Sequence, residues 1–274
     1  MNNPKVLVAL SHGLYEPWLS ILNQGQAKTW LELTRPSEMQ VVHFHSTKLG
    51  ALGWKFDRLH EFLRWKNKWF AYVLQIFDRL VGFPLMFYVP SYSRSEKLGT
   101  TDLAVHIHFP DSYQFMRWKD LSVLKYFVTE TNADFIFMST TSSYLMPHKL
   151  LEVIQTFPKN KVYAGVNPYD GANFAAGNNR LISRDVANLI LKHRIRFDPG
   201  VIEDRAMGEM LTKMKIEFKP LPSLHVISED ELDRISNSKL MGHFHIRVKS
   251  GVFLKRNDVS LMQAVHRRVL GEIS

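Results

Sequence analysis

Apolar and polar positions follow two recurring patterns along the chain. Short continuous apolar runs end in small polar residues, and longer segments between them carry apolar residues every three or four positions. The runs are typical of strands buried on both faces, and the longer segments are typical of helices. The runs predict five strands, over residues 5–10, 39–44, 103–107, 134–138 and 161–164.

The longer segments predict helices over residues 18–33, 119–131 and 148–156. Strands that alternate with helices predict an α/β fold with a mostly parallel central sheet flanked by helices. We find no internal repeat, low-complexity tract or linker, so we expect one domain over residues 1–274.

Residues 48–95 depart from this alternation and are read as a helical insertion. Near-helical spacing of apolar residues predicts at least one amphipathic helix, and the segment is rich in aromatic residues. Its interpretation stays open between a helix packed on its own domain and one that contacts an anionic membrane or a lipid acceptor. The aromatic and basic residues include Trp54, Phe56, Phe62, Trp65, Trp69, Phe70, Tyr72, Phe77, Phe83, Phe87, Tyr88, Lys55, Arg58, Arg64, Lys66, Lys68 and Arg79.

Composition narrows the classes of partner and compartment. The formal charge of +9 favours an anionic partner, and the absence of cysteine fits a reducing compartment. The first apolar run is too short for a signal peptide or an anchor, so we expect a cytoplasmic protein, peripheral at the inner face of the membrane if the insertion binds there. The sequence contains no recognisable nucleic-acid-binding module, which disfavours nucleic acid as the partner.

A short stretch around residue 200 carries two adjacent carboxylates. A turn at Pro199 and Gly200 is followed by Glu203 and Asp204, where a helix is expected to begin. Acidic residues suit a helix N-terminus, so these two side chains have a purely structural interpretation. They also have a catalytic one, because a carboxylate acts as a general base when burial or a neighbouring charge raises its pKa.

Several motifs, taken in order, resemble the family 31 glycosyltransferases, the group that contains Fringe and the β-1,3-galactosyltransferases. The resemblance implies a GT-A fold and inverting transfer from a nucleotide-sugar donor, by family habit a UDP-sugar. The matching segments are Thr29-Trp30, Phe109 to Tyr113 with Lys119, residues 134–150, residues 177–190, and Glu203-Asp204 with Gly208.

One departure from that family concerns the metal. The family's run of aspartates, which binds a divalent ion, is replaced here by Thr140, Thr141 and Ser142. Hydroxyl groups are poor ligands for Mg²⁺ and Mn²⁺, so we expect no bound metal and disfavour either ion as a cofactor. The leaving diphosphate then needs preorganised cations instead.

The C-terminal segment offers such cations. On a strand, His243, His245, Arg247 and Lys249 share one face because side chains alternate with period two. They are our candidates for the diphosphate site. The alternative is a half-exposed edge strand whose basic face is solvated.

The resemblance implies roles for further residues. Asp204 is the candidate catalytic base, with Glu203 as the alternative. The candidates for the nucleotide-sugar site are Ser11, His12, Asp111, Lys119, Thr140, Thr141, Ser142, Asn178 and Arg180. His106 and His108 alternate on a strand, but they lack a third ligand in register for zinc.

Two functions from different classes follow. The first is a metal-independent inverting glycosyltransferase acting on a glycan or a lipid-linked saccharide. The second is a non-catalytic sugar-nucleotide-binding protein on a decayed transferase fold, since loss of the aspartates is also a route to inactivity.

Overall fold

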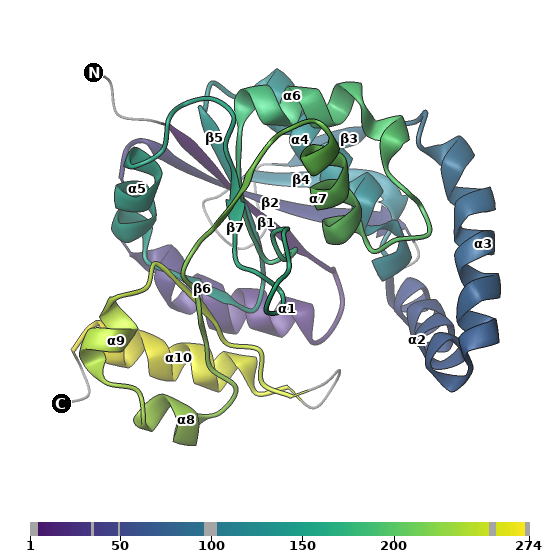
Figure 1. Cartoon of the computed structure of the whole chain (residues 1–274). Coiled ribbons are helices and arrows are strands. Elements are labelled where there is room, and N and C mark those ends of the chain that lie inside the picture. The colour runs from purple at the N-terminus through teal and green to yellow at the C-terminus, as the bar shows by residue number, and fades with distance from the viewer. Residues whose placement is uncertain (1–4, 34–35, 49, 96–102, 252–255, 272–274) are drawn as a thin grey trace.

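The fold is built on an eight-stranded sheet within the described residues 5–33, 36–48, 50–95, 103–251 and 256–271 of a computed structural model (Figure 1). The strand order is β3-β4-β2-β1-β5-β8-β7-β9, and β4, β2, β1 and β5 run parallel. Strand β3 is antiparallel to β4, and β8 is antiparallel to both its neighbours. The bounds are β1 Val6–His12, β2 Met39–Lys48, β3 Tyr92–Ser95, β4 Leu103–Pro110, β5 Phe135–Thr140, β7 Tyr163–Gly165, β8 Asn179–Ser183 and β9 Phe218–Pro220.

Both faces of the sheet are covered. Along β1, Val6, Val8 and Leu10 belong to one apolar core, and Leu7 and Ala9 belong to the other. Helices α5 and α10 pack in the first core, whereas α4, α6 and α7 pack in the second. The helix bounds are α4 Met116–Glu130, α5 Pro147–Gln155, α6 Arg184–Lys192, α7 Glu203–Lys213 and α10 Asp258–Val269.

A three-stranded sheet ties the C-terminal segment to the end of β5. Its order is β10-β11-β6, and the Val248 N–H donates to the Ser142 carbonyl over 2.8 Å. The segment after β5 therefore meets the segment after β11. The elements are β6 Ser143–Leu145, β10 Leu224–His225, α8 Glu229–Asp233, α9 Asn237–Met241 and β11 His245–Arg247.

The predicted α/β class is confirmed, with a large central sheet flanked by helices. All five predicted strands and the helices over 119–131 and 148–156 are present within a few residues of their expected limits. The sheet is more mixed than expected, because β3 and β8 are antiparallel to their neighbours.

The single helix predicted over 18–33 is wrong. The structure has α1 Trp18–Ser20, a π-helical turn Ile21–Gly25 and 3₁₀ turns Gln26–Lys28 and Trp30–Glu32. Polar side chains interrupt the helix: the Gln26 amide donates to the Thr140 and Ser143 carbonyls, and the Thr29 hydroxyl donates to the Gly25 carbonyl.

The insertion forms two helices, α2 Gly50–Lys66 and α3 Lys68–Leu85, and Figure 1 shows α3 at the outer edge of the molecule. Asn67 separates them, and its side chain accepts a hydrogen bond from the Trp69 N–H. No helix among the described residues is long and apolar enough to cross a membrane. The side chains of Trp54, Phe56, Arg58, Arg64 and Trp65 lie outside the described part of the structure.

Strand pairing at Gly165 generates a stability prediction. A Cβ atom there would lie 2.2 Å from the Asn179 carbonyl oxygen, so Gly165→Ala must push β7 away from β8. Overpacking of this kind costs about 1–3 kcal/mol, and each kcal/mol lowers the melting temperature by about 2–4 °C in a protein of this size. Thermal unfolding followed by circular dichroism measures the loss.

Gly25→Ala is the matched control, because its Cβ would meet the Met262 Sδ at 3.4 Å, an ordinary contact. Equal melting temperatures for Gly165→Ala and Gly25→Ala would contradict the strand geometry described here.

Candidate functional site

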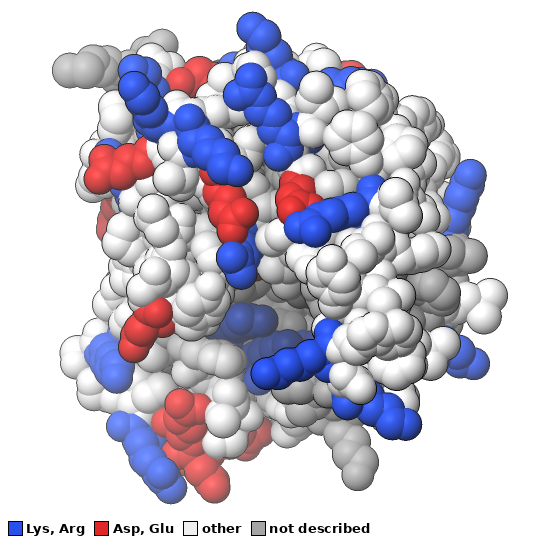
Figure 2. Space-filling model, turned by 45° about the vertical axis from the view of Figure 1, so that its right-hand side comes forward, with Lys and Arg blue, Asp and Glu red and all other residues white. Residues whose placement is uncertain are grey.

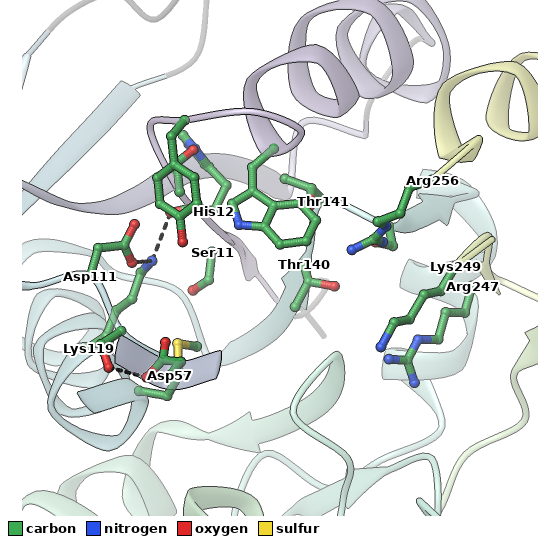
Figure 3. Close-up of a pocket in the computed structure, with 16 residues that line it drawn as sticks. Ser11, His12, Asp57, Asp111, Lys119, Thr140, Thr141, Arg247, Lys249 and Arg256 are labelled. Atoms are coloured by element: carbon green, nitrogen blue, oxygen red, sulfur yellow. Dashed lines mark hydrogen bonds and ion pairs between the residues drawn. The ribbon is translucent and has the colours of Figure 1, made fainter. Parts of the chain in front are cut away.

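A cavity of about 240 Å³ opens at the carboxyl ends of β1 and β5 (Figure 3). Ligands in open α/β sheets bind at this edge. Figure 2 shows a hollow on this side of the molecule, with Lys and Arg side chains along it. The cavity is lined by Ser11, His12, Gly13, Tyr15, Trp18, Asp57, Asp111, Ser112, Met116, Lys119, Thr140, Thr141, Ser142, Arg247, Lys249 and Arg256.

The turn of Thr140, Thr141 and Ser142 lines this cavity. Gln26 is fully buried and holds both ends of the turn. Its side-chain amide donates to the carbonyls of Thr140 and Ser143, each over 3.1 Å. Thr140 is in register with Ser11 of β1. Three hydroxyl side chains are thereby presented to whatever occupies the cavity.

One wall is cationic. Arg247, Lys249 and Arg256 reach the cavity from the C-terminal segment, and Figure 3 shows all three on the same side. Arg256 is held in place: it bonds to Asp258 and to the Ser142 hydroxyl, and its guanidinium lies 4.5 Å from the centre of the Trp18 ring. Asp258 balances the charge of this guanidinium, so Arg256 contributes a fixed N–H donor to this wall, and the positive charge comes from the other side chains.

The opposite wall combines a buried lysine with carboxylates. Lys119 Nζ donates to the His12 carbonyl over 2.8 Å and lies 3.5 Å from Asp111 Oδ1. Asp57 of α2 accepts a 2.5 Å hydrogen bond from the Ser112 hydroxyl. Burial lowers the pKa of His12 well below its usual value, although a hydrogen bond to the Gly13 carbonyl opposes it, so the ring is neutral at physiological pH. This wall suits the hydroxyl groups of a ribose or a sugar, which carboxylates accept from.

A buried acidic cluster lies at the start of α7. Arg180 Nη2 donates to Asp120 Oδ2 over 2.5 Å, and both side chains are almost fully buried. Burial, followed by the charges of Asp204 and Asp120, raises the pKa of Glu203 from 4.5 to about 8. Burial also raises the pKa of Asp120, although Arg180 opposes it. For Arg180 the burial effect is downward, but the three carboxylates outweigh it and raise its pKa.

Arg117 fixes the backbone of the turn that precedes this cluster. Its guanidinium donates to the carbonyls of Asp198, Pro199 and Val201. The predicted turn at Pro199 and Gly200 therefore leads into α7, which begins at Glu203 as expected.

The structure brings nine of the predicted site residues to the cavity. They are Ser11, His12, Asp111, Lys119, Thr140, Thr141, Ser142, Arg247 and Lys249. Asn178 is buried behind the turn, where its carbonyl accepts from the Ser139 hydroxyl over 3.1 Å, and Arg180 is in the acidic cluster.

The two candidate carboxylates lie outside the lining of the main cavity. Glu203 borders a separate space of about 40 Å³ together with Arg117 and Pro199. Asp204 is half-buried, and its Oδ1 accepts from the next backbone N–H over 2.7 Å. Both interact electrostatically with the Asp120–Arg180 pair.

The structure does not bring His243 and His245 to the cavity. Strand β11 covers only His245–Arg247, so the predicted strand over 243–249 is shorter than expected. His245 is fully buried between the hydroxyls of Ser223 and Ser143, at 2.7 and 3.0 Å, and burial lowers its pKa to about 3. His243 Nδ1 donates to the Lys239 carbonyl in α9. Neither ring supplies a cation to an anion in the cavity.

Seven lining residues were not among the predicted site residues: Gly13, Tyr15, Trp18, Asp57, Ser112, Met116 and Arg256. The position of Trp18, just beyond the predicted first strand and its turn, was a usable signal, because this edge binds ligands. Nothing local distinguishes Arg256 from other surface arginines.

Within the described part of the chain, no group of three or more His, Cys, Asp or Glu side chains has an arrangement that could hold a metal ion. His106 instead pairs with His45, with Nδ1 and Nε2 2.6 Å apart, and its Nε2 lies 2.7 Å from the Ser95 hydroxyl.

Comparisons with known proteins give distant similarity. No model of a known protein family and no curated protein matches the sequence. Among solved structures, the glycosyltransferase GlyE of Streptococcus pneumoniae TIGR4 has a TM-score of 0.47 at 12% identity, over 96% of this chain and 60% of that one. Its apo form gives 0.43 at 10%, over 97% and 60%. Apo mouse xyloside xylosyltransferase 1 gives 0.44 at 9%, over 90% of this chain and 98% of that one. The chain thus spans about 60% of the length of GlyE, and similarity at this level identifies neither a substrate nor a reaction.

The pKa of Glu203 generates a prediction about stability and pH. Because the folded state holds this proton up to about pH 8 and the unfolded state releases it near 4.5, the free energy of unfolding should fall as pH rises through that window. One pKa unit corresponds to about 1.4 kcal/mol. Glu203→Gln mimics the protonated acid, so it should melt several degrees above the wild type at pH 8 and close to it at pH 4.5.

Glu209→Gln, on the exposed side of the same helix, is the control and should leave the pH profile of the melting temperature unchanged. A Glu203→Gln profile parallel to that of the wild type from pH 4.5 to 8 would contradict the shifted pKa.

Proposed function

We propose that this chain is an inverting glycosyltransferase of the GT-A type, which moves a sugar from a nucleotide-sugar donor to a hydroxyl of a glycan or lipid-linked saccharide. One observation carries the proposal. The cations of Arg247, Lys249 and Arg256 converge on the turn of Thr140 to Ser142, where the family 31 glycosyltransferases carry their aspartates. The similarity of its motifs to that family supports the choice of reaction.

The cationic wall is proposed to hold the donor diphosphate. Charge-assisted hydrogen bonds from guanidinium and ammonium groups are short and strong, and they stabilise the charge that develops on a leaving diphosphate. A divalent ion fits this site less well, because the turn offers hydroxyls in place of carboxylates and because the Lys119 ammonium lies 3.5 Å from Asp111 Oδ1. We therefore propose donor binding without a metal, and UDP as the nucleotide by family resemblance alone.

Asp204, which lies outside the lining of the cavity, is proposed as the general base on the family resemblance alone. As the acceptor oxygen forms its bond to the anomeric carbon, the hydroxyl proton passes to the Asp204 carboxylate. The bond from the anomeric carbon to the phosphate oxygen breaks, and its electron pair leaves with the diphosphate. Glu203 is the weaker candidate at neutral pH, because a carboxyl group with a pKa of about 8 is protonated there.

The cationic wall generates the first test of function. Arg247→Ala and Lys249→Ala should each weaken binding of UDP, because losing a hydrogen bond to a charged group costs about 1.5–3 kcal/mol, or roughly 10- to 100-fold in Kd. Titration calorimetry measures the loss, and EDTA should leave the wild-type affinity unchanged.

Arg267→Ala and Lys239→Ala are the matched controls, since both side chains are exposed in the same C-terminal segment. A strict requirement of wild-type binding for added Mn²⁺, or equal losses in the control variants, would overturn the proposed site.

Asp204 generates the second test. Asp204→Asn should lower turnover by about 10²- to 10⁴-fold, the usual contribution of a general base, while the Kd for UDP stays close to the wild-type value. Release of UDP from a panel of UDP-sugars with and without saccharide acceptors reports turnover, with Glu209→Gln as the control. A wild type that binds UDP but turns over no donor in the panel would favour the sugar-nucleotide-binding alternative.

A further inference from the structure

Helix α3 has its polar and apolar sides reversed relative to an ordinary surface helix. Two of its polar side chains contact the rest of the protein: Arg79 donates to both Asp198 oxygens over 2.9 and 2.7 Å, and Asp78 lies 3.4 Å from the ring of His60 on α2. Contact with the domain is close at Gly82, where a Cβ would lie 2.5 Å from Pro199. A surface helix normally turns its apolar stripe inward.

The apolar side of α3 faces outward. Its most exposed side chains are Leu80 at 71%, Trp69 and Tyr72 at 62%, Phe77 at 54% and Phe83 at 52%. Spacings of three and four residues place Trp69, Leu80 and Phe83 on one side of the helix.

The apolar surface continues beyond α3. Phe87 and Tyr88 extend it beyond the end of the helix, at 60% and 48% exposure. On α2, Leu59 and Phe62 are exposed at 55% and 59%. A contiguous apolar surface of this kind on a soluble domain marks an interaction site.

The charges at the border of this surface identify the partner. Lys55, Lys66 and Lys68 are exposed on the two helices, and Lys66 Nζ lies 5.5 Å from the centre of the Phe62 ring. The acidic side chains described on the hairpin turn inward, Asp57 to Ser112 and Asp78 to His60. In Figure 2 the side that carries α3 shows a broad uncharged area bordered by Lys and Arg.

We infer that the hairpin of α2 and α3 docks into the interface of an anionic lipid bilayer. Aromatic side chains of Trp, Tyr and Phe lie at the headgroup level, and lysines at the border meet the anionic headgroups. A second copy of this chain is the poorer partner, because a two-fold contact would bring two basic borders together.

Docking also places the cavity at the membrane surface. Asp57 of α2 lines the cavity, and the Arg79–Asp198 ion pair joins α3 to the turn that precedes Glu203. The inference about the bilayer stands on the hairpin alone. Its link to a lipid-linked acceptor rests on the proposed transferase function.

Vesicle sedimentation tests the docking. The full chain should sediment with phosphatidylcholine vesicles that contain phosphatidylglycerol. Leu80→Glu and Phe77→Glu should each lower the partition coefficient about tenfold or more, because burying such a side chain contributes about 1.5–3 kcal/mol. Ile227→Glu is the matched control, since Ile227 is 54% exposed elsewhere on the protein, and it should bind as the wild type does.

The charge at the border has its own variant. Lys66→Glu combined with Lys68→Glu should weaken binding to vesicles with phosphatidylglycerol and remove most of its salt dependence. All these side chains are exposed, so each variant should melt at the wild-type temperature, which separates lost docking from lost folding.

Two outcomes would overturn the inference. One is a wild type that stays in the supernatant with anionic vesicles. The other is a concentration-dependent dimer in sedimentation velocity that Leu80→Glu abolishes while vesicle binding is unchanged, which would assign the surface to a second copy. Arg247→Ala should bind vesicles normally, so failure of the donor site and failure of docking are distinguishable.

Discussion

The junction between the turn after β5 and the segment after β11 brings basic side chains to the cavity at the carboxyl edge of the sheet. The Val248 N–H and the Gln26 amide hold the turn from two sides, through the carbonyls of Ser142 and Thr140. Because Val248 is fixed to the turn in this way, its neighbours Arg247 and Lys249 reach the cavity at the carboxyl edge of the sheet. A stretch of chain more than 100 residues downstream of β5 thus supplies the charge that the turn itself lacks.

Burial divides the titratable groups into two sets with different chemistry. At the cavity, burial keeps the ring of His12 neutral, so the positive potential comes from the arginine and lysine side chains that line it. Outside the cavity lining, the carboxyl groups of Asp120, Glu203 and Asp204 all interact electrostatically with the Arg180 guanidinium. Ionising all three buried or half-buried carboxyl groups beside a single guanidinium is electrostatically unfavourable. Glu203 is the one that keeps its proton, because burial and the charges of the other two raise its pKa to about 8. For that reason we propose Asp204, and not Glu203, as the general base.

The fold was predictable where burial alone decides the structure. Strands such as β1 are apolar on both faces, and such runs are recognisable without tertiary information. The interruption of the helix expected over 18–33 was not predictable in this way, because the Gln26 amide makes hydrogen bonds that exist only once β5 and β6 are in place.

The cavity residues at the end of β1 were predicted because ligands bind at that edge of the sheet, whereas Thr140 to Ser142 were predicted from the family resemblance. The alternation of side chains along a strand predicted that Arg247 faces the site, and Arg247 lines the cavity. The same alternation carries no information on which residues cover His245, which is fully buried. The position of Arg256 depends on Asp258, two residues further along the chain, and on Trp18. Trp18 is distant in the sequence and becomes a neighbour of Arg256 only in the fold. Likewise, the spacing in α3 revealed a two-sided helix without revealing that the apolar side faces out.

A crystal structure of the protein with UDP, grown in the presence of EDTA, tests the central claim most directly. The account predicts the diphosphate within hydrogen-bond distance of Arg247, Lys249 and Arg256, beside the hydroxyls of Thr140 to Ser142. A diphosphate bound away from these side chains would contradict it, as would UDP that appears in the cavity only when crystals are grown with Mn²⁺.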